Sequence, residues 1–519
     1  MYSLLLQLAY GLSSFFAPPS ADDGLLVQTA QGPVRGISVN GNRQFLGIPY
    51  AADTATYRFE PPQQAYPRGS QVFDASNWGD SCPAEISPSA AAALNISGIL
   101  DQQLKVPTSE NCLNLNIWAP ATNRPQKTAV MIWVYGGSGK FGTSNTLPYN
   151  GSFFTRDYDD ITIVSINYRT NVFGFPNAPG SWNVGLLDVE FAVKWVYANI
   201  ANFGGDPNRI TLFGESFGSL AVDAYAIRNP QDTIVKRVIL ESGVVGLDFF
   251  IAPDPTVWTN LTKATGCTSR PDVMKCMRSV PWKDLQATIL SSNVTFTAIT
   301  DGQCYTLFGD WQRRLTQGGF LRVPTLLGNN ANEGDIFVAA YEATGGKLPK
   351  DVSFNVASAA ITDVLFHCLA FQSASLRVGA NSPTYRYIYE GVFDDINNGN
   401  KSLRAFHTSE IPIVFQTYTL SPFSKNYKPT DVEIKLSKYI QNAWVLFARE
   451  GPQGLESLKW RPFVVNDIAH PSINVLGGAN NPTGVDYERT ATHDAGCSKL
   501  EKEIDIIWPI IHHLNGNVL

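Results

Sequence analysis

Runs of consecutive apolar residues, many of them β-branched, recur along the chain and predict buried strands. They lie at 128–135, 161–168, 209–213, 237–241 and 323–328. Segments with apolar residues at helical spacing lie between or after several of these runs, at 183–200, 220–227 and 430–450. Because apolar strands alternate with helices, we expect an α/β fold with a large, mostly parallel central sheet covered by helices. At the start of the last helix, Thr430 and Glu433 form a capping-box pattern.

The size of the chain allows one large core. It has 519 residues, 44% of them hydrophobic, which excludes a disordered protein. No linker, internal repeat or low-complexity block divides the sequence, so we expect a single domain over 22–519. The formal net charge of −6 argues against a nucleic-acid partner. Beyond the N-terminal stretch no apolar run reaches transmembrane length, and we expect no transmembrane segment.

Several features indicate export from the cell. The first 21 residues hold a short apolar stretch followed by small residues, which predicts a signal peptide over 1–21. Five glycosylation sequons are consistent with a secreted, extracellular protein, at Asn95, Asn150, Asn260, Asn293 and Asn400. Seven cysteines fit an oxidising compartment, and their odd number leaves at least one free or paired between chains. No cysteine or histidine spacing suggests a metal site.

The segment 209–230 places a serine at a tight corner between a strand and a helix. Ser216 follows the apolar run 209–213 and is flanked by Gly214 and Gly218, two residues away on either side. Glycines remove the Cβ atoms that would collide in such a turn and leave the serine hydroxyl exposed, as in a nucleophile elbow. The following helix directs its N-terminal N–H groups and positive dipole end toward any anion formed there. The pattern therefore predicts a nucleophilic serine.

A nucleophilic serine needs a base and an acid that orients the base. All six histidines follow the serine, which leaves the α/β-hydrolase order of serine, acid, histidine. From the local sequence, His407 is the first candidate for the base, His470 and His493 remain open, and His367 fits a core position. His512 and His513 lie in the C-terminal tail, a poor place for fixed geometry. The acid is Glu333 or Asp335, which follow the strand expected at 323–328.

A glycine-rich turn after the strand 128–135 predicts an oxyanion hole. Gly136 and Gly137 free the backbone to direct successive N–H groups at one point. We assign the donors to Gly137, Ser138 and Phe217, the residue after the nucleophile. Such donors stabilise the tetrahedral intermediate of acyl transfer, and this chemistry needs no cofactor.

These residues resemble the type-B carboxylesterase/lipase family, which includes fungal secreted esterases and lipases and the cholinesterases. The resemblance covers nearly the whole chain from about residue 24. It rests on segments 45–51, 109–120, 134–142, 167–175, 199–219, 328–335 and 405–415. It implies an α/β-hydrolase fold with large loop insertions and a catalytic triad of Ser216, Glu333 and His407.

The resemblance also implies structural pairs. It implies disulfides Cys82–Cys112 and Cys267–Cys276 and buried ion pairs Arg58–Glu110 and Arg169–Asp188. Cys304, Cys368 and Cys497 stay unassigned, and Ser242 resembles the family's serine beside the triad acid. The chain departs from the family pattern at Ser138, where glycine is usual, and at Phe217, where a small residue is usual; Asn111 and Asn332 replace commoner acids. We hypothesise that Phe217 narrows the acyl side of the site.

The sequence therefore predicts a secreted serine hydrolase that cleaves carboxylic esters of small molecules through an acyl-enzyme. A histidine base must be neutral, so activity should fall below about pH 6. The alternatives are a triacylglycerol lipase with a lid in the Cys82–Cys112 loop, an acyltransferase or lactonase serving one natural product, and a non-catalytic binding protein on the same fold. The loop is only mildly apolar and carries the Asn95 sequon, which favours soluble, shorter-chain or aromatic esters.

Overall fold

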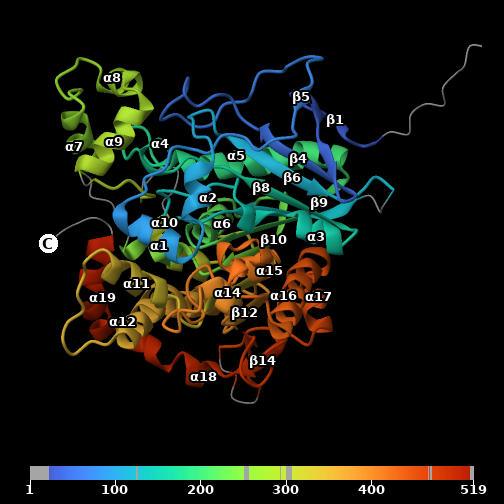
Figure 1. Ribbon diagram of the computed structural model, residues 1–519, viewed down its shortest axis with the longest axis vertical. Helices are drawn as coiled ribbons and strands as arrows, with labels where there is room; N and C mark the ends of the chain where they lie inside the picture. The colour runs from blue at the N-terminus through green and yellow to red at the C-terminus, as the bar shows by residue number, and fades with distance from the viewer. Residues whose placement is uncertain are drawn as a thin grey trace, which may run out of the picture.

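A long central sheet organises the molecule (Figure 1). The computed structural model describes residues 23–514 apart from 124–126, 251–255, 293, 300–306, 466 and 468–469. Within these residues, eleven strands form one sheet in the order β14-β13-β12-β11-β10-β9-β7-β8-β6-β4-β3. The pairings from β8 to β13 are parallel, and those at both ends are antiparallel. The expected signal peptide 1–21, the Asn293 sequon and Cys304 lie outside the described residues.

The five predicted strands are all present. They are β7 (Thr128–Val134), β8 (Ile161–Ile166), β9 (Gly205–Glu215), β10 (Val235–Glu241) and β11 (Thr325–Asn330). Every residue of β7, β8 and β11 is buried, as expected for parallel strands covered on both faces. The remaining strands of the sheet are β3 (Ile37–Val39), β4 (Asn42–Pro49), β6 (Asn114–Ala119), β12 (Thr384–Tyr389), β13 (Ile473–Leu476) and β14 (Val485–Glu488).

Helices surround the sheet (Figure 1). The three predicted ones are α5 (Val184–Asn199), α6 (Phe217–Arg228) and α16 (Asp431–Glu450). The capping box is confirmed, because the Thr430 side chain accepts from the Glu433 N–H and the Glu433 side chain accepts from the Thr430 N–H. α6 packs on β7, β9 and β10, and α16 packs on β7 and β9. Strand β9 ends at Glu215 and α6 begins at Phe217, so Ser216 lies between the two elements.

One continuous helix runs through the C-terminal half. It comprises α12 (Phe354–Ile361), a π-helical turn (Thr362–His367) and α13 (Cys368–Gly379). Within the described part of the chain it alone is long and apolar enough to cross a membrane by length and composition, which the sequence expectation did not anticipate. In this fold 61% of its most apolar window is buried, as in a core helix.

Three disulfides brace the loops. Cys82–Cys112 and Cys267–Cys276 are the pairs that the family resemblance implied, and Cys368–Cys497 pairs two cysteines that the sequence left unassigned. The second disulfide lies in a lobe formed by α7 (Val257–Ala264), α8 (Val273–Ser279) and α9 (Trp282–Ser292), at one corner of the molecule in Figure 1. An apolar cluster separate from the main core contains Trp258 and Met277 of this lobe and also Phe59 and Phe173 from outside it.

Both implied ion pairs are also present. The Arg58 Nε lies 2.6 Å from Glu110 Oε1, and the Arg169 Nη2 lies 2.7 Å from Asp188 Oδ1, all within buried side chains. Arg58 additionally donates to backbone carbonyls of the α8 region, including Met277. This arginine therefore ties the lobe to the main body of the fold.

Candidate active site

Ser216 occupies the corner between β9 and α6. Its backbone is strained, with φ 57° and ψ −125°, and its N–H donates to the Glu241 carbonyl on β10 at 2.9 Å. A Cβ on Gly214 would lie 2.6 Å from the Val134 carbonyl oxygen, and a Cβ on Gly218 would collide with the same oxygen. Only glycines therefore allow the elbow to pass this close to β7, as the sequence predicted.

The structure brings His407 and Glu333 together. Glu333 directly precedes α11 (Gly334–Ala343) and follows β11 by three residues. Its Oε2 lies 2.6 Å from Nδ1 of His407, and its Oε1 accepts from the Asn330 N–H at 2.6 Å. Because both oxygens are engaged and the side chain is fully buried, Glu333 can hold the imidazole in one orientation.

The second ring nitrogen of His407 faces another glutamate. Nε2 lies 3.2 Å from Oε1 of Glu215, the residue before Ser216. Among the described residues no hydrogen bond joins His407 to the Ser216 hydroxyl; such bonds are often long in a free enzyme. The sequence reasoning missed Glu215. Its only local signal is a charged side chain at the end of an apolar strand, next to the nucleophile.

The competing acid and bases have other partners. Asp335 accepts from the Arg404 guanidinium at 2.7 Å and from the Ser358 hydroxyl at 2.6 Å. His367 is buried against Asp494, as its core position predicted, and His493 pairs with Glu488. The two C-terminal histidines lie in a helix, α19 (Glu501–Leu514), where a loose tail was expected: His513 contacts Thr344, and His512 contacts Trp508. His470 is exposed.

Two aromatic rings flank the imidazole. The ring centroids of Phe337 and Phe366 lie 5.2 and 4.8 Å from that of His407. Phe366 comes from the π-helical turn 362–367, whose first residue, Thr362, accepts from the Gly334 N–H. These contacts restrict rotation of the His407 side chain.

The loop 136–142 has the geometry of an oxyanion hole. Gly137, Ser138 and Gly139 all have positive φ, of 106°, 58° and 70°. Among the described residues, the N–H groups of Gly137, Ser138 and Phe217 have no acceptor. A Cβ on Gly136 would lie 2.8 Å from the Ser216 Cβ, so the loop lies directly against the serine. At Ser138, where glycine is usual in the family that the chain resembles, the positive φ costs free energy that glycine would not.

The side chain of Phe217 is 1% exposed. Its ring lies 5.5 Å from Phe175 and 6.3 Å from Tyr168 between centroids. A Cβ on Gly139 would come within 2.8 Å of the Phe217 ring. The ring therefore fills the space under the loop 136–142, and a glycine at 139 is required for it to fit.

Ser242 lies in the turn after β10, with φ 51°, and its N–H donates to the Gly328 carbonyl at 2.8 Å. Its hydroxyl has no hydrogen-bond partner within the described residues, Glu333 included. The supporting role that the family resemblance implied for Ser242 therefore stays a prediction.

Three buried carboxyl groups interact with one another near the site: Glu215, Glu241 and Glu410. Glu215 and Glu410 also interact with Glu333. Burial, followed by repulsion from neighbouring carboxylates, raises the pKa of Glu215 and of Glu410 well above the usual range. Burial raises the pKa of Glu241 to about 8, although a hydrogen bond from Trp444 Nε1 opposes the rise. A raised pKa favours the neutral form of these carboxyl groups, which limits negative charge around the histidine.

Replacing Glu241 with glutamine should reduce the loss of stability as the pH rises. The Glu241 carboxyl has a pKa of about 8 when folded and about 4.3 when unfolded, so it holds a proton in the folded state that the unfolded chain releases. Its contribution to the free energy of unfolding is complete below about pH 4 and falls toward pH 8, by up to about 1.4 kcal/mol per pH unit. Glutamine still accepts from Trp444 but does not ionise.

Urea unfolding of the wild type and of Glu241→Gln at pH 5 and pH 8 measures this effect. The free energy of unfolding should fall less over this interval in the variant. An equal fall in both proteins would contradict the assignment of a raised pKa to Glu241.

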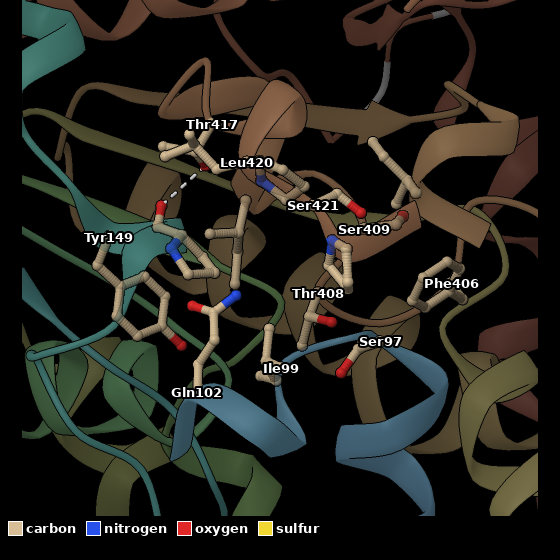
Figure 2. Close-up of a pocket in the computed structure, with 15 residues that line it drawn as sticks. Ser97, Ile99, Gln102, Tyr149, Phe406, Thr408, Ser409, Thr417, Leu420 and Ser421 are labelled. Atoms are coloured by element: carbon tan, nitrogen blue, oxygen red, sulfur yellow. Dashed lines mark hydrogen bonds between the residues drawn. The ribbon is translucent and has the colours of Figure 1, made fainter. Parts of the chain in front are cut away.

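A pocket lies near the chain segment that carries His407, although neither His407 nor Ser216 is among its lining residues (Figure 2). Its lining includes Phe406 and Thr408, which flank His407 in the chain, and Tyr149. Ser97 and Gln102, from the Cys82–Cys112 loop, form another part of the wall. Apolar side chains and a few hydroxyl and amide groups therefore surround this space.

One further cluster has metal-ligand residue types. His367, Asp494 and Cys497 lie within ligand distance of one another in the described part of the chain. Cys497 forms a disulfide, and both carboxylate oxygens of Asp494 accept from Nη1 of Arg386, so these atoms already stabilise the fold.

The sheet order and the strand–serine–helix corner are those of an α/β-hydrolase. The solved structure of a thermophilic PNB esterase superposes with a TM-score of 0.74 at 25% sequence identity, and the match covers 92% of this chain and 100% of that one. A second PNB esterase structure gives a TM-score of 0.73. The central fold expectation is therefore confirmed.

The sequence profile of the carboxylesterase family matches residues 23–355 and 346–477. Secreted lipase 5 of Gibberella zeae is 31% identical over 455 residues, which cover 80% of this chain and 83% of that protein. Chlorogenic acid esterase of Aspergillus niger is 34% identical over 449 residues, with 83% and 84% covered. The chain belongs to the carboxylesterase family and is a carboxylic-ester hydrolase.

Proposed function

We propose that Ser216, His407 and Glu333 form the catalytic triad of this esterase. The observation that carries the proposal is the buried Glu333–His407 hydrogen bond of 2.6 Å, next to a serine held at a strained strand–helix corner. His407 Nε2 removes the Ser216 proton as the hydroxyl oxygen attacks the ester carbonyl. Glu333 fixes the ring and stabilises the imidazolium.

The N–H groups of Gly137, Ser138 and Phe217 then bind the tetrahedral oxyanion. Each such donor contributes roughly a hundredfold or more in rate. The imidazolium protonates the leaving alcohol, and an acyl group remains on Ser216. Water, deprotonated by His407, attacks this acyl-enzyme. The bond between the acyl group and Ser216 Oγ breaks, the imidazolium returns its proton to that oxygen, and the acid is released. The cycle needs only groups of this chain, the ester and water.

We further propose that the substrates are soluble esters with short or aromatic acyl groups. The Cys82–Cys112 loop supports this, because it contributes only short helices, α1 (Pro88–Ile96) and α2 (Leu100–Lys105), and carries the exposed Asn95 sequon. The chlorogenic acid esterase relative is consistent with an aromatic acyl group.

Hydrolysis of p-nitrophenyl esters of increasing chain length, with and without emulsified triglyceride, tests the substrate proposal. We expect the highest kcat/KM with short or aromatic acyl groups and little activity on the emulsion. Activity that rises with chain length and increases at the emulsion interface would instead indicate a lipase, as in the Gibberella zeae relative.

The same ester series tests the expectation for Phe217. Replacing it with alanine empties the space beside Gly139, so the preference should shift toward longer or bulkier acyl groups. The truncation should also lower the free energy of unfolding by about 3–5 kcal/mol. An unchanged chain-length preference in folded Phe217→Ala would contradict the idea that this ring narrows the acyl side.

We also propose that the protein is secreted as a single domain over 22–519 after removal of residues 1–21. The three disulfides support an oxidising compartment. Among the described sequons, Asn95, Asn260 and Asn400 are exposed and Asn150 is half-buried. Mass spectrometry of the protein from culture medium, before and after glycosidase treatment, tests both the cleavage and the glycans.

A further inference from the structure

The oxyanion loop depends on bonds to its carbonyl groups. Ser138 has a φ of 58°, a conformation that costs free energy for any residue except glycine. The Gly137 carbonyl accepts from Lys140 and Phe141 within the loop, and the Gly139 carbonyl accepts from the Asn171 N–H at 2.7 Å. The carbonyl of Ser138, between them, accepts from the Thr297 hydroxyl at 3.0 Å.

Thr297 comes from a distant segment, 294–299, and its residue surface is 1% exposed. Within the described residues, its hydroxyl is the only side-chain donor to the carbonyls of 137–139. A Cβ on Gly139 would lie 3.1 Å from this hydroxyl and 2.8 Å from the Phe217 ring. Thr297 and Phe217 therefore contact the same point of the loop, and only Thr297 forms a directional bond there.

We propose that Thr297 is a positioning residue for the oxyanion hole. The Cα of Ser138 joins two peptide groups. The first contains the Ser138 N–H that we assign to the oxyanion, and the second contains the Ser138 carbonyl that accepts from Thr297. Fixing the second peptide group stabilises the left-handed conformation of Ser138 and so sets the direction of its N–H. The inference rests on the proposed catalytic role of Ser216 and its oxyanion hole.

Thr297→Val tests the inference because it removes the hydroxyl and keeps the shape. Loss of an oxyanion donor costs roughly 10²–10³ in rate, and a misdirected donor should cost less. We expect kcat to fall about tenfold, with KM changed less than about twofold. A trifluoromethyl ketone, which adds Ser216 to form a tetrahedral oxyanion, should bind about tenfold more weakly, whereas an unreactive alcohol analogue of the same ketone should bind as before.

Thr297→Ser supplies the rescue. It restores the hydroxyl without the methyl group, and its kcat should return to within about twofold of the wild type. Replacing Ser138 with glycine should shrink the effect of Thr297→Val to less than about threefold, because glycine adopts positive φ without the supporting bond. Should Thr297→Val fail to fold, Thr297→Ala gives the same comparison with Thr297→Ser.

Thr211→Val is the matched control. Thr211 is a fully buried threonine of β9 whose hydroxyl has no partner among the described residues, so its replacement should leave kcat unchanged. Unchanged kcat and inhibitor affinity in Thr297→Val would overturn the inference, as would an equal loss in Thr297→Ser. Neither result affects the proposed function, which fails separately if Ser216→Ala remains active.

Discussion

Ser216→Ala should lower kcat by roughly 10⁴- to 10⁶-fold, because the triad acts as a unit and no other group can form the acyl-enzyme. The methyl side chain fits the space of the serine, and the backbone bond from Ser216 N–H to the Glu241 carbonyl is retained. The fold should therefore persist. Stopped assays with a short p-nitrophenyl ester at saturating concentration measure the loss.

Ser291→Ala is the control for this replacement. Ser291 lies on the exposed face of α9 and donates only to the Thr288 carbonyl of its own helix, so its loss should leave kcat unchanged. Circular dichroism should show both variants folded. More than a few per cent of wild-type kcat in folded Ser216→Ala would exclude this serine as the nucleophile.

Glu333→Gln should lower kcat by roughly 10³- to 10⁴-fold, the second largest effect we expect. The amide keeps the size of the side chain but can present an N–H₂ group to Nδ1 of His407, which favours the wrong tautomer, and it cannot stabilise an imidazolium. KM for a short ester should change little, since Glu333 is fully buried behind the histidine. Steady-state kinetics across a range of pH measures both constants.

Asp335→Asn separates the two candidate acids. Asp335 accepts from the Arg404 guanidinium and backbone N–H and from Ser358, so its replacement should cost stability, by about 1–3 kcal/mol. The kcat of the folded variant should stay near that of the wild type. If Asp335→Asn abolished kcat while Glu333→Gln kept it, the acid would have been assigned to the wrong residue.

The sequence predicts the central strands well because each is an apolar run with helices on both sides. The ends of the strands are less predictable. The predicted strand 209–213 omits the polar residues before it, but β9 begins at Gly205. This extension exists because Gly205 pairs with Thr128 of β7. β11 continues to Asn330, since this polar residue pairs with Tyr389 of β12. Pairing partners are distant in the chain and leave no local signal.

In the candidate site, too, the local sequence predicts some features, and others depend on residues that are distant in the chain. The Ser216 corner and the loop 136–142 are local patterns, and the sequence predicts both. Choosing His407 and Glu333 over their neighbours needed the family resemblance, because the partners of Asp335 come from other segments. Glu215 and Thr297 went unnoticed, since their roles depend on which atoms the fold places within 3.2 and 3.0 Å.

Labelling with a serine-directed organophosphate tests the central claim most directly. The proposed triad predicts one equivalent of label on the wild-type chain, located by mass spectrometry on the peptide that contains Ser216, with parallel loss of ester hydrolysis. Ser216→Ala should take up none. Stoichiometric label on a different residue, or labelling of Ser216→Ala with equal speed, would contradict the assignment of Ser216 as the activated nucleophile.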